Sequence, residues 1–387
     1  MIRSVKVRIF PTPEQENRIW KHIHACRFMW NYMLNLQNER QKSGEPFLRH
    51  YDMNYLLPVL KKQEGYEWLA EVSHASLQAI CGDLNKAYKM FWKGLKRHPK
   101  FKSKKTARPC YPVRCTKGSF YFRDGFLQIE GLGKVKYSTN YSVPQGRDVK
   151  FHNPRIFYNC ANGKWMVGFG LDYENQVVDL TDSAMGIDLG VKSLATVSFA
   201  DNCLVFGSIN KSAKIRRLKK KLNYIDHVIA RKRNYYKKEH PHSELIKSKA
   251  LLKYEQIRRE LFYKISCIRT NYTHNITAQL VAMRPAAVVM EDLSVRDMQR
   301  NRSLSKAVGE QNFSMFIQQM QYKCEYWGIP FLKADRYYPS SKICSRCGNV
   351  KSVLSLKERT YVCECCGEVI DRDYNAAKNL QGLAQAQ

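Results

Sequence analysis

The sequence predicts a multidomain protein of mixed α/β and α+β class, and three observations lead to this prediction. Short apolar runs that end in an acid recur in the C-terminal half, as the strands of a buried sheet do. Two closely spaced cysteine pairs interrupt that half and indicate an inserted four-cysteine zinc ribbon. The N-terminal half contains several short alternating stretches, which favour a β-barrel with a helical insert.

The chain opens with a predicted strand and a long predicted helix. Residues 4–10 alternate basic and apolar side chains and end at Pro11, as a half-buried strand would. Thr12 and Pro13 then mark a helix N-terminus, and apolar residues follow at helical spacing. A second helix is expected from about Ser76 to Leu95. The apolar face of the first helix comprises Ile19, Ile23, Cys26, Trp30 and Leu34.

A basic run without acids follows the second helix. Residues 93–117 contain ten lysines and arginines, with Phe101 and Tyr111 among them. Charge runs are often solvated surface, but interleaved aromatic residues also favour contact with a nucleic-acid backbone. The candidate nucleic-acid-binding residues here are Lys100, Lys102, Lys104 and Lys105.

Strand-like stretches complete the N-terminal half. Together with residues 4–10 they would build a small barrel. A break in composition at residues 178–183 then marks the boundary before the α/β domain. The stretches lie at residues 119–122, 126–129, 149–151, 156–158 and 165–173.

Three carboxylates stand at the ends of predicted elements in the C-terminal half. Asp188 and Glu291 each end a short apolar run, and Asp373 lies at the start of a helix with spaced alanines and leucines. Mg²⁺ prefers carboxylate oxygens, and two such ions about 3.5–4 Å apart stabilise the attacking and leaving oxygens of an in-line displacement. The three acids together therefore predict a two-metal phosphodiesterase site.

Each acid alone also has an ordinary structural explanation. Asp188 suits a turn, Glu291 a solvated strand end, and Asp373 a first helical turn favoured by the helix dipole. The catalytic interpretation depends on their occurring together. His274, a lone histidine on a helix, is left outside the site because metal-dependent phosphoryl chemistry does not require it.

Two C-x-x-C-Gly knuckles lie between the second and third acids. Cys344 and Cys347 are followed, after fifteen intervening residues, by Cys363 and Cys366. This is the spacing of a four-cysteine zinc ribbon, with redox or disulfide chemistry as the competing interpretation. Cys365 does not fit the two-residue gap and is expected to be a free neighbour.

A basic helical hairpin is predicted between the first and second acids. Residues 211–238 carry twelve Lys/Arg and one acid, and residues 251–283 form a further helical stretch. Pro241 favours a break between them. A solvated hairpin and phosphate contact both fit this pattern. Lys219 and Lys220 are the candidate nucleic-acid-binding residues.

The composition independently indicates a polyanionic partner. The 387 residues carry 65 Lys+Arg against 34 Asp+Glu, a formal charge of +31. No apolar run approaches about 18 residues, and the first residues show no signal-peptide pattern, so we expect no membrane partner. We expect a cytoplasmic, nucleic-acid-associated protein whose 13 cysteines are reduced or metal-bound.

The order of these motifs closely resembles the TnpB proteins of bacterial and archaeal insertion sequences. TnpB proteins are RNA-guided DNA endonucleases related to the compact type V CRISPR effectors. The order of the three acids likewise resembles the motifs of RuvC-type nucleases, members of the RNase H-like superfamily. The resemblance is carried by residues 186–190, 291–294, 339–348, 363–367 and 371–377, with support from residues 26–31 and 99–102.

The resemblance implies roles for the residues of the site. Asp188, Glu291 and Asp373 would hold two catalytic Mg²⁺ ions, and the four knuckle cysteines one structural Zn²⁺. Asp292 and Asp371 would only border the triad, and Arg372 would hold a carboxylate or a phosphate. A guide RNA from the transposon end would direct cleavage of double-stranded DNA beside a short target-adjacent motif.

The resemblance also implies a division of the chain. The predicted segments are a wedge-like barrel (1–12 and 106–180), a helical recognition insert (13–105), a RuvC-like nuclease (181–343 and 367–387) and the zinc ribbon (344–366).

Three alternative functions remain. A DNA transposase would also use an acidic triad on an RNase H-like fold. A guide-independent RNase H-like nuclease would cleave without bound RNA. An RNA-guided DNA-binding repressor would not need the acids, and the presence of all three argues against it.

Overall fold

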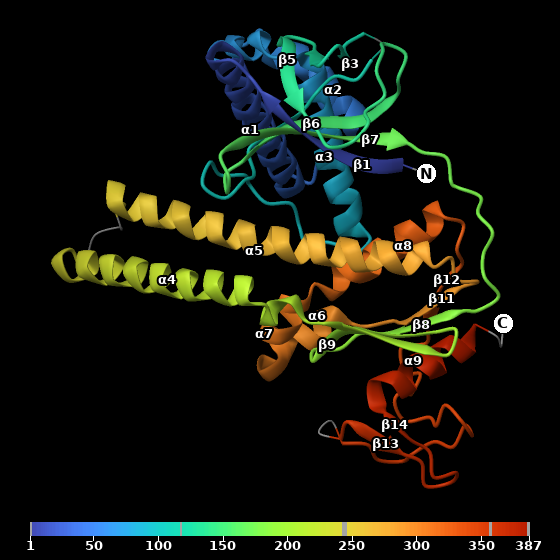
Figure 1. Ribbon diagram of the computed structural model, residues 1–387. Coiled ribbons are helices and arrows are strands. Elements are labelled where there is room, and N and C mark those ends of the chain that lie inside the picture. Colours follow the sequence, from blue (N-terminus) through green and yellow to red (C-terminus); the bar gives the residue numbers. More distant parts are fainter. Residues whose placement is uncertain (1, 117, 242–245, 356–357, 385–387) are drawn as a thin grey trace. The chain divides into compact units, whose positions relative to one another are not determined.

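The computed structural model describes residues 2–116, 118–241, 246–355 and 358–384 (Figure 1). The chain divides after Tyr173 into two compact units. The finer division into wedge, insert, nuclease and ribbon stays a prediction. Parts of it lie outside the described residues, namely Met1 and Lys117 of the wedge segments, residues 242–245 and 385–387 of the nuclease segments, and residues 356–357 of the ribbon.

The first unit contains a seven-stranded antiparallel sheet in the order β2-β6-β7-β1-β5-β4-β3. The predicted first strand forms, with Val5, Val7 and Ile9 buried on alternate positions. In the described pairings β2 and β3 are the edges of the sheet, so closure into a barrel stays a prediction. The strands are β1 (Ile2–Phe10), β2 (Cys110–Pro112), β3 (Phe120–Arg123), β4 (Phe126–Ile129), β5 (Gly133–Ser138), β6 (Phe151–Asn159) and β7 (Lys164–Asp172).

Strand β6 was predicted as two separate short stretches, residues 149–151 and 156–158. It is one strand whose register against β7 shifts between His152 and Arg155. The cause is local, because Asn153 has a left-handed φ of 47° and Pro154 has no backbone N–H for the ladder.

Four helical segments pack into the same core as this sheet. The predicted N-terminus of α1 (Pro13–Lys42) is confirmed, since Thr12 and Gln15 form a reciprocal capping box. The second predicted helix is α3 (His74–Trp92). Two segments that the sequence analysis did not predict lie between them, α2 (His50–Leu60) and the short 3₁₀ helix η1 (Glu67–Glu71).

The second unit contains a mixed five-stranded sheet in the order β10-β9-β8-β11-β12. The predicted first hairpin is confirmed, since β8 pairs antiparallel with β9. On its other side β8 runs parallel to β11, so both strands end at the same edge. The strands are β8 (Met185–Asp188), β9 (Ser193–Phe199), β10 (Asn202–Gly207), β11 (Val288–Glu291) and β12 (Phe331–Ala334).

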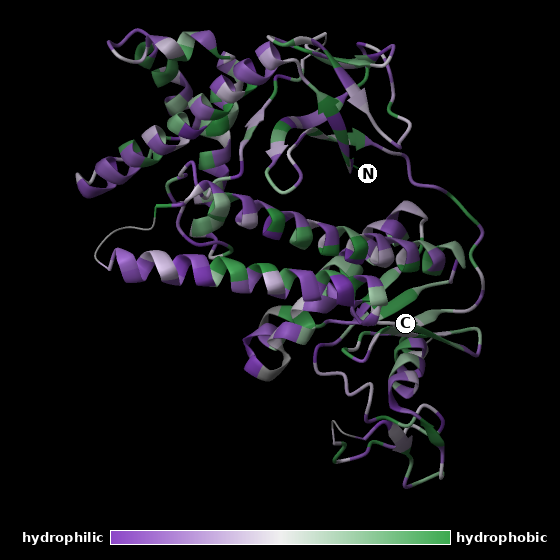
Figure 2. Ribbon diagram, turned by 60° about the vertical axis from the view of Figure 1, so that its left-hand side comes forward, coloured by the Kyte–Doolittle hydropathy of each residue, from purple (hydrophilic) through white to green (hydrophobic). Residues whose placement is uncertain are grey.

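Two long helices, α4 (Ala213–Glu239) and α5 (Lys249–Ala282), form the predicted hairpin. They share a small apolar core of their own that includes Ile225, Leu261 and Ile265. Figure 2 shows hydrophilic residues along much of both helices and hydrophobic residues on the strands of the sheet. Within the described residues, no helix has the length and apolar character required to cross a membrane.

The remaining elements follow β10 in the sequence. Shorter helices are the 3₁₀ helix η2 (Ile209–Lys211), α6 (Val295–Arg300), α7 (Arg302–Gln311) and α8 (Phe313–Tyr326). Strands β13 (Thr360–Val362) and β14 (Val369–Asp371) pair antiparallel within the predicted ribbon. Helix α9 (Arg372–Leu383) follows directly and packs against β8, β9 and β11.

Candidate active site and metal centre

Two of the predicted acids end adjacent parallel strands. Asp188 is the last residue of β8, and Glu291 is the last residue of β11. The strand register pairs Ile187 with Met290, so the two carboxylates follow at the same level of the sheet. A short apolar run ending in an acid therefore becomes a buried strand that carries its carboxylate to the sheet edge.

The third acid lies in the first turn of α9, where Asp371 is the N-cap. The Asp371 carboxylate accepts hydrogen bonds from the backbone N–H groups of Asp373 at 2.9 Å and Tyr374 at 3.1 Å. It therefore satisfies two of the free amide groups at the helix start. This leaves the Asp373 carboxylate as the acid of the first turn that does not cap the helix.

Helix α9 reaches β8 closely because position 186 has no side chain. A Cβ atom at Gly186 would lie 2.0 Å from the carbonyl oxygen of Ala377 and 2.4 Å from the backbone nitrogen of Gln381. The Gln381 side chain also accepts a hydrogen bond of 2.6 Å from Ser198 in β9. The first glycine of the Gly-Ile-Asp-Leu-Gly motif thus determines how near α9 approaches the strand that ends in Asp188.

The three carboxylates interact electrostatically. Burial raises the pKa of Asp188 well above its usual value, and the nearby charges of Glu291 and Asp373 raise it further, while Arg372 opposes the rise. Burial also raises the pKa of Glu291, against a hydrogen bond from Ser340 and the charge of Arg372. Bound cations would offset this unfavourable crowding of negative charge. Carboxylate oxygens are also the donors that Mg²⁺ prefers.

The acids do not form a compact site for one ion. Among the described residues, only the four knuckle cysteines form a group of at least three potential ligands whose atoms all lie within 4.8 Å of one another. A two-metal site distributes its ligands over ions about 3.5–4 Å apart, so it does not require such a compact group.

The two neighbouring acids have other partners. Asp371 caps α9, as described above. Asp292 accepts a hydrogen bond of 2.8 Å from Arg336, and Lys333 lies 3.8 Å from its other oxygen. Its charge is therefore compensated by a cation of β12 and a second cation just after that strand.

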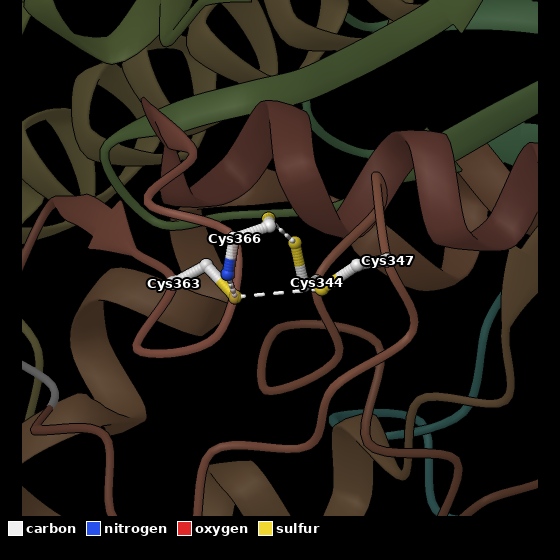
Figure 3. Close-up of side chains that lie close together, drawn as sticks. All are labelled: Cys344, Cys347, Cys363 and Cys366. Carbon is white, nitrogen blue, oxygen red and sulfur yellow. Dashed lines mark hydrogen bonds between the residues drawn. The ribbon is translucent and has the colours of Figure 1, made fainter.

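The four predicted zinc ligands form one cluster (Figure 3). The Sγ atoms of Cys344 and Cys366 are 3.6 Å apart, as are those of Cys347 and Cys363. Disulfide sulfurs would be separated by about 2.0 Å, whereas Zn–S bonds of about 2.3 Å place tetrahedral sulfurs about 3.8 Å apart. The cluster therefore fits zinc, and Cys365 lies outside it as predicted.

The local backbone supports thiolates at this cluster. Gly348 and Gly367, which follow the two knuckles, have left-handed φ angles of 77° and 71°. The backbone N–H of Cys366 lowers the pKa of Cys363 to about 6. This contact favours the thiolate form of Cys363, and the thiolate is the form that binds metal.

The candidate nucleic-acid-binding lysines fall into two groups. Lys102 lies with its Nζ 3.4 Å from the ring centroid of Trp30, and Lys219 forms an ion pair of 2.7 Å with Glu310. These two are partly buried and contribute contacts within the protein. The other four are exposed, namely Lys100, Lys104, Lys105 and Lys220.

The basic segment is attached to α1 by residues whose role the sequence analysis missed. Trp30 Nε1 donates to the carbonyl of Lys100 at 3.0 Å. Asn31 and the backbone of Lys102 exchange two hydrogen bonds, of 2.9 and 2.7 Å. The two N-terminal motifs that carry the resemblance therefore bind one another. The one indication in the sequence that these residues matter was that both motifs support the family resemblance.

Two family descriptions match parts of the chain. "Cas12f1-like, TNB domain" matches residues 313–380, which include the cysteine cluster and Asp373. "Helix-turn-helix domain" of the IS605 OrfB type matches residues 1–46, which fold here as β1 and the single long helix α1.

Similar proteins extend over nearly the whole chain. The "Putative RNA-guided DNA endonuclease" of Streptomyces pristinaespiralis is 27% identical over 384 residues, covering 99% of this chain and 90% of the relative. A protein of the same description from Escherichia coli (strain K12), InsQ, is 24% identical over 409 residues, covering 100% and 93%. The cryo-EM structure of a Cas12f1–sgRNA–target DNA complex is similar in fold, with a TM-score of 0.60, 15% identity and 98% coverage of both chains.

Proposed function

Because the chain belongs to the TnpB family, which is related to Cas12f, we propose that it is an RNA-guided endonuclease acting on double-stranded DNA. A guide RNA derived from the transposon end directs it to a site beside a short target-adjacent motif. The proposal is supported by the placement of three acids on neighbouring elements: Asp188 ends β8, Glu291 ends β11 and Asp373 lies in the first turn of α9. The charges of Glu291 and Asp373 both act on Asp188.

The chemistry proposed for this site is metal-dependent phosphodiester hydrolysis. Asp188, Glu291 and Asp373 would hold two Mg²⁺ ions, which would supply activation of a water and stabilisation of the charge that develops on the phosphoryl oxygens. The residues of the chain hold the carboxylates in place for this. Arg372 partly compensates the acids, and Ser340 fixes one oxygen of Glu291. Cleavage leaves 5′-phosphate and 3′-hydroxyl ends.

The surrounding segments take the roles that the resemblance implies. Residues 181–343 and 367–387 form a RuvC-like nuclease of RNase H-like type, interrupted by the zinc ribbon at 344–366. Residues 1–12 and 106–180 form a wedge-like barrel, and the recognition insert at 13–105 interrupts it in the sequence. The five-stranded mixed sheet and the cysteine cluster support this assignment.

The guide RNA is the proposed first partner. A formal charge of +31 favours a long polyanionic partner, to whose phosphates the exposed lysines of the basic segments would bind. The RNA would confer sequence specificity by base pairing, while the protein reads only the motif beside the target.

The test is to sequence the RNA that copurifies with the protein and to challenge the complex with a plasmid library of randomised flanks. We expect cleavage only of plasmids that match the guide, with a common motif beside the cut target. Equal cleavage of matched and unmatched plasmids by RNA-free protein would contradict the proposal and favour a guide-independent nuclease. Strand-transfer products from a donor end would identify a transposase.

A further inference from the structure

One short segment contacts both the strand of Glu291 and the helix of Asp373. This segment, residues 339–344, leads into the first cysteine knuckle. The hydroxyl of its Ser340 donates a hydrogen bond to Oε1 of Glu291. Its backbone carbonyls accept hydrogen bonds from two asparagines of α9. The segment therefore links two acids that lie on separate elements.

The asparagines bind the segment through three hydrogen bonds and the next residue, Ser345, through a fourth. Asn375 Nδ2 donates to the carbonyl of Ile343 at 2.6 Å, and its Oδ1 accepts from the backbone N–H of Ser345 at 3.0 Å. Asn379 Nδ2 donates to the carbonyls of Ser340 and Ile343, both at 2.7 Å. Because Ser345 lies inside the first knuckle, that knuckle is bound directly to α9.

These side chains are buried, which makes loss of their partners unfavourable. Ser340, Asn375 and Asn379 are 3%, 0% and 8% exposed. The asparagines stand four residues apart on the face of α9 that also buries Ala376 and Leu380. Packing alone would favour apolar residues there. The amides are explained by the backbone groups of the knuckle that they bind.

We propose that Ser340, Asn375 and Asn379 are positioning residues that couple the zinc ribbon to the acidic site. The knuckle holds α9, and hence Asp373, while the same segment orients the carboxylate of Glu291. Zinc binding thereby fixes two metal-binding acids relative to one another. This inference rests on the proposed function, which assigns metal binding to those acids, and it names the residues through which the ribbon acts.

The test measures ion binding at the acids directly, using Mn²⁺ and EPR on the full-length chain. RNA is removed because its phosphates bind the same ion, and an Asp188→Ala chain defines the signal that does not come from the site. We expect Ser340→Ala and Asn375→Ala each to weaken site binding roughly tenfold or more, the usual effect of removing a group that orients a metal ligand.

Two further variants separate positioning from general destabilisation. Ser340→Thr retains a hydroxyl and should keep most of the Mn²⁺ affinity. Ser341→Ala, at the adjacent serine, removes a hydroxyl for which no hydrogen bond to another described residue is found, and should leave the affinity unchanged. Ser340→Ala should also retain as much zinc per chain as the wild type, because it changes no thiolate.

Wild-type Mn²⁺ affinity in both Ser340→Ala and Asn379→Ala would overturn the proposal, and this comparison decides the matter if Asn375→Ala does not fold. Equal losses in Ser340→Ala and Ser341→Ala would overturn it too. The Mn²⁺ measurement requires no cleavage, so it tests the positioning residues independently of the proposed function. The proposed function is contradicted by a different result, the failure of the wild-type complex to cleave guide-matched DNA.

Discussion

Replacing Gly186 with alanine should displace α9 and thereby disturb the acidic site. The new Cβ would lie 2.0 Å from the carbonyl oxygen of Ala377, about 1.4 Å short of ordinary contact, and 2.4 Å from the backbone nitrogen of Gln381. Both neighbours are backbone atoms of a helix, so no side-chain rotation relieves the clash. The helix must retreat from β8 as a unit.

The consequence for cleavage follows from geometry. Displacement of a reacting group by about 1 Å can lower the rate roughly 100-fold, and overpacking costs about 1–3 kcal/mol of stability. We therefore expect Gly186→Ala to lower single-turnover cleavage by about two orders of magnitude while the complex still binds RNA and target. Rates of matched-target cleavage and thermal melting of the same preparations measure the two effects.

A matched control exists on the same helix. At Gly382 a Cβ would meet no atom within 4 Å outside the neighbouring backbone. Gly382→Ala should leave the cleavage rate unchanged and stabilise the protein by about 0.5–1 kcal/mol through helix propensity. If Gly186→Ala cleaved and melted like the wild type, the close approach of α9 to β8 would not determine the site.

Three further outcomes are expected. Because the folded-state pKa of Asp188 is raised, the metal-free protein loses stability as pH rises above the unfolded value near 4 and through the folded pKa, so Asp188→Asn should raise its melting temperature at neutral pH. A lower melting temperature for this variant, measured without divalent cations, would contradict the electrostatic account. Purified protein should contain about one zinc per chain and Cys347→Ser less, as elemental analysis would show, and unchanged zinc content would exclude this ligand set. Reversing three exposed lysines to glutamate should weaken RNA binding and reduce its salt dependence without changing melting, whereas Lys102→Glu should also lower the melting temperature. If the lysine-to-glutamate variant bound RNA as tightly as the wild type in filter binding, this basic segment would not contact the RNA. The three lysines are Lys100, Lys104 and Lys105.

Local patterns predicted the elements that carry the acids. The apolar runs before Asp188 and Glu291 form buried strands, as β8 and β11 show. The cysteine spacing likewise predicted the cluster, because each pair of ligands lies within one short knuckle and only the two knuckles must come together in the fold. In each case the signal lies within a few neighbouring residues.

Long-range contacts escaped prediction for a physical reason. Strand β5 was missed for a different, local reason: Val135 is its only buried residue and lies between exposed lysines, so its alternating pattern is too short to recognise. The requirement for glycine at position 186 comes from α9, nearly two hundred residues later. The partners of Lys102 and Ser340 are also distant in sequence. Motif resemblance identified several of these positions without indicating what they contact.

The most direct test of the central claim compares the wild type with Asp188→Ala, each bound to its copurified RNA, on guide-matched plasmid in Mg²⁺. Binding to RNA and target is measured on the same complexes. We expect the variant to bind both but to leave the plasmid uncut, because the lost carboxylate holds catalytic ions rather than the duplex. Cleavage by Asp188→Ala at the wild-type rate would contradict the assignment of these acids as the nuclease site.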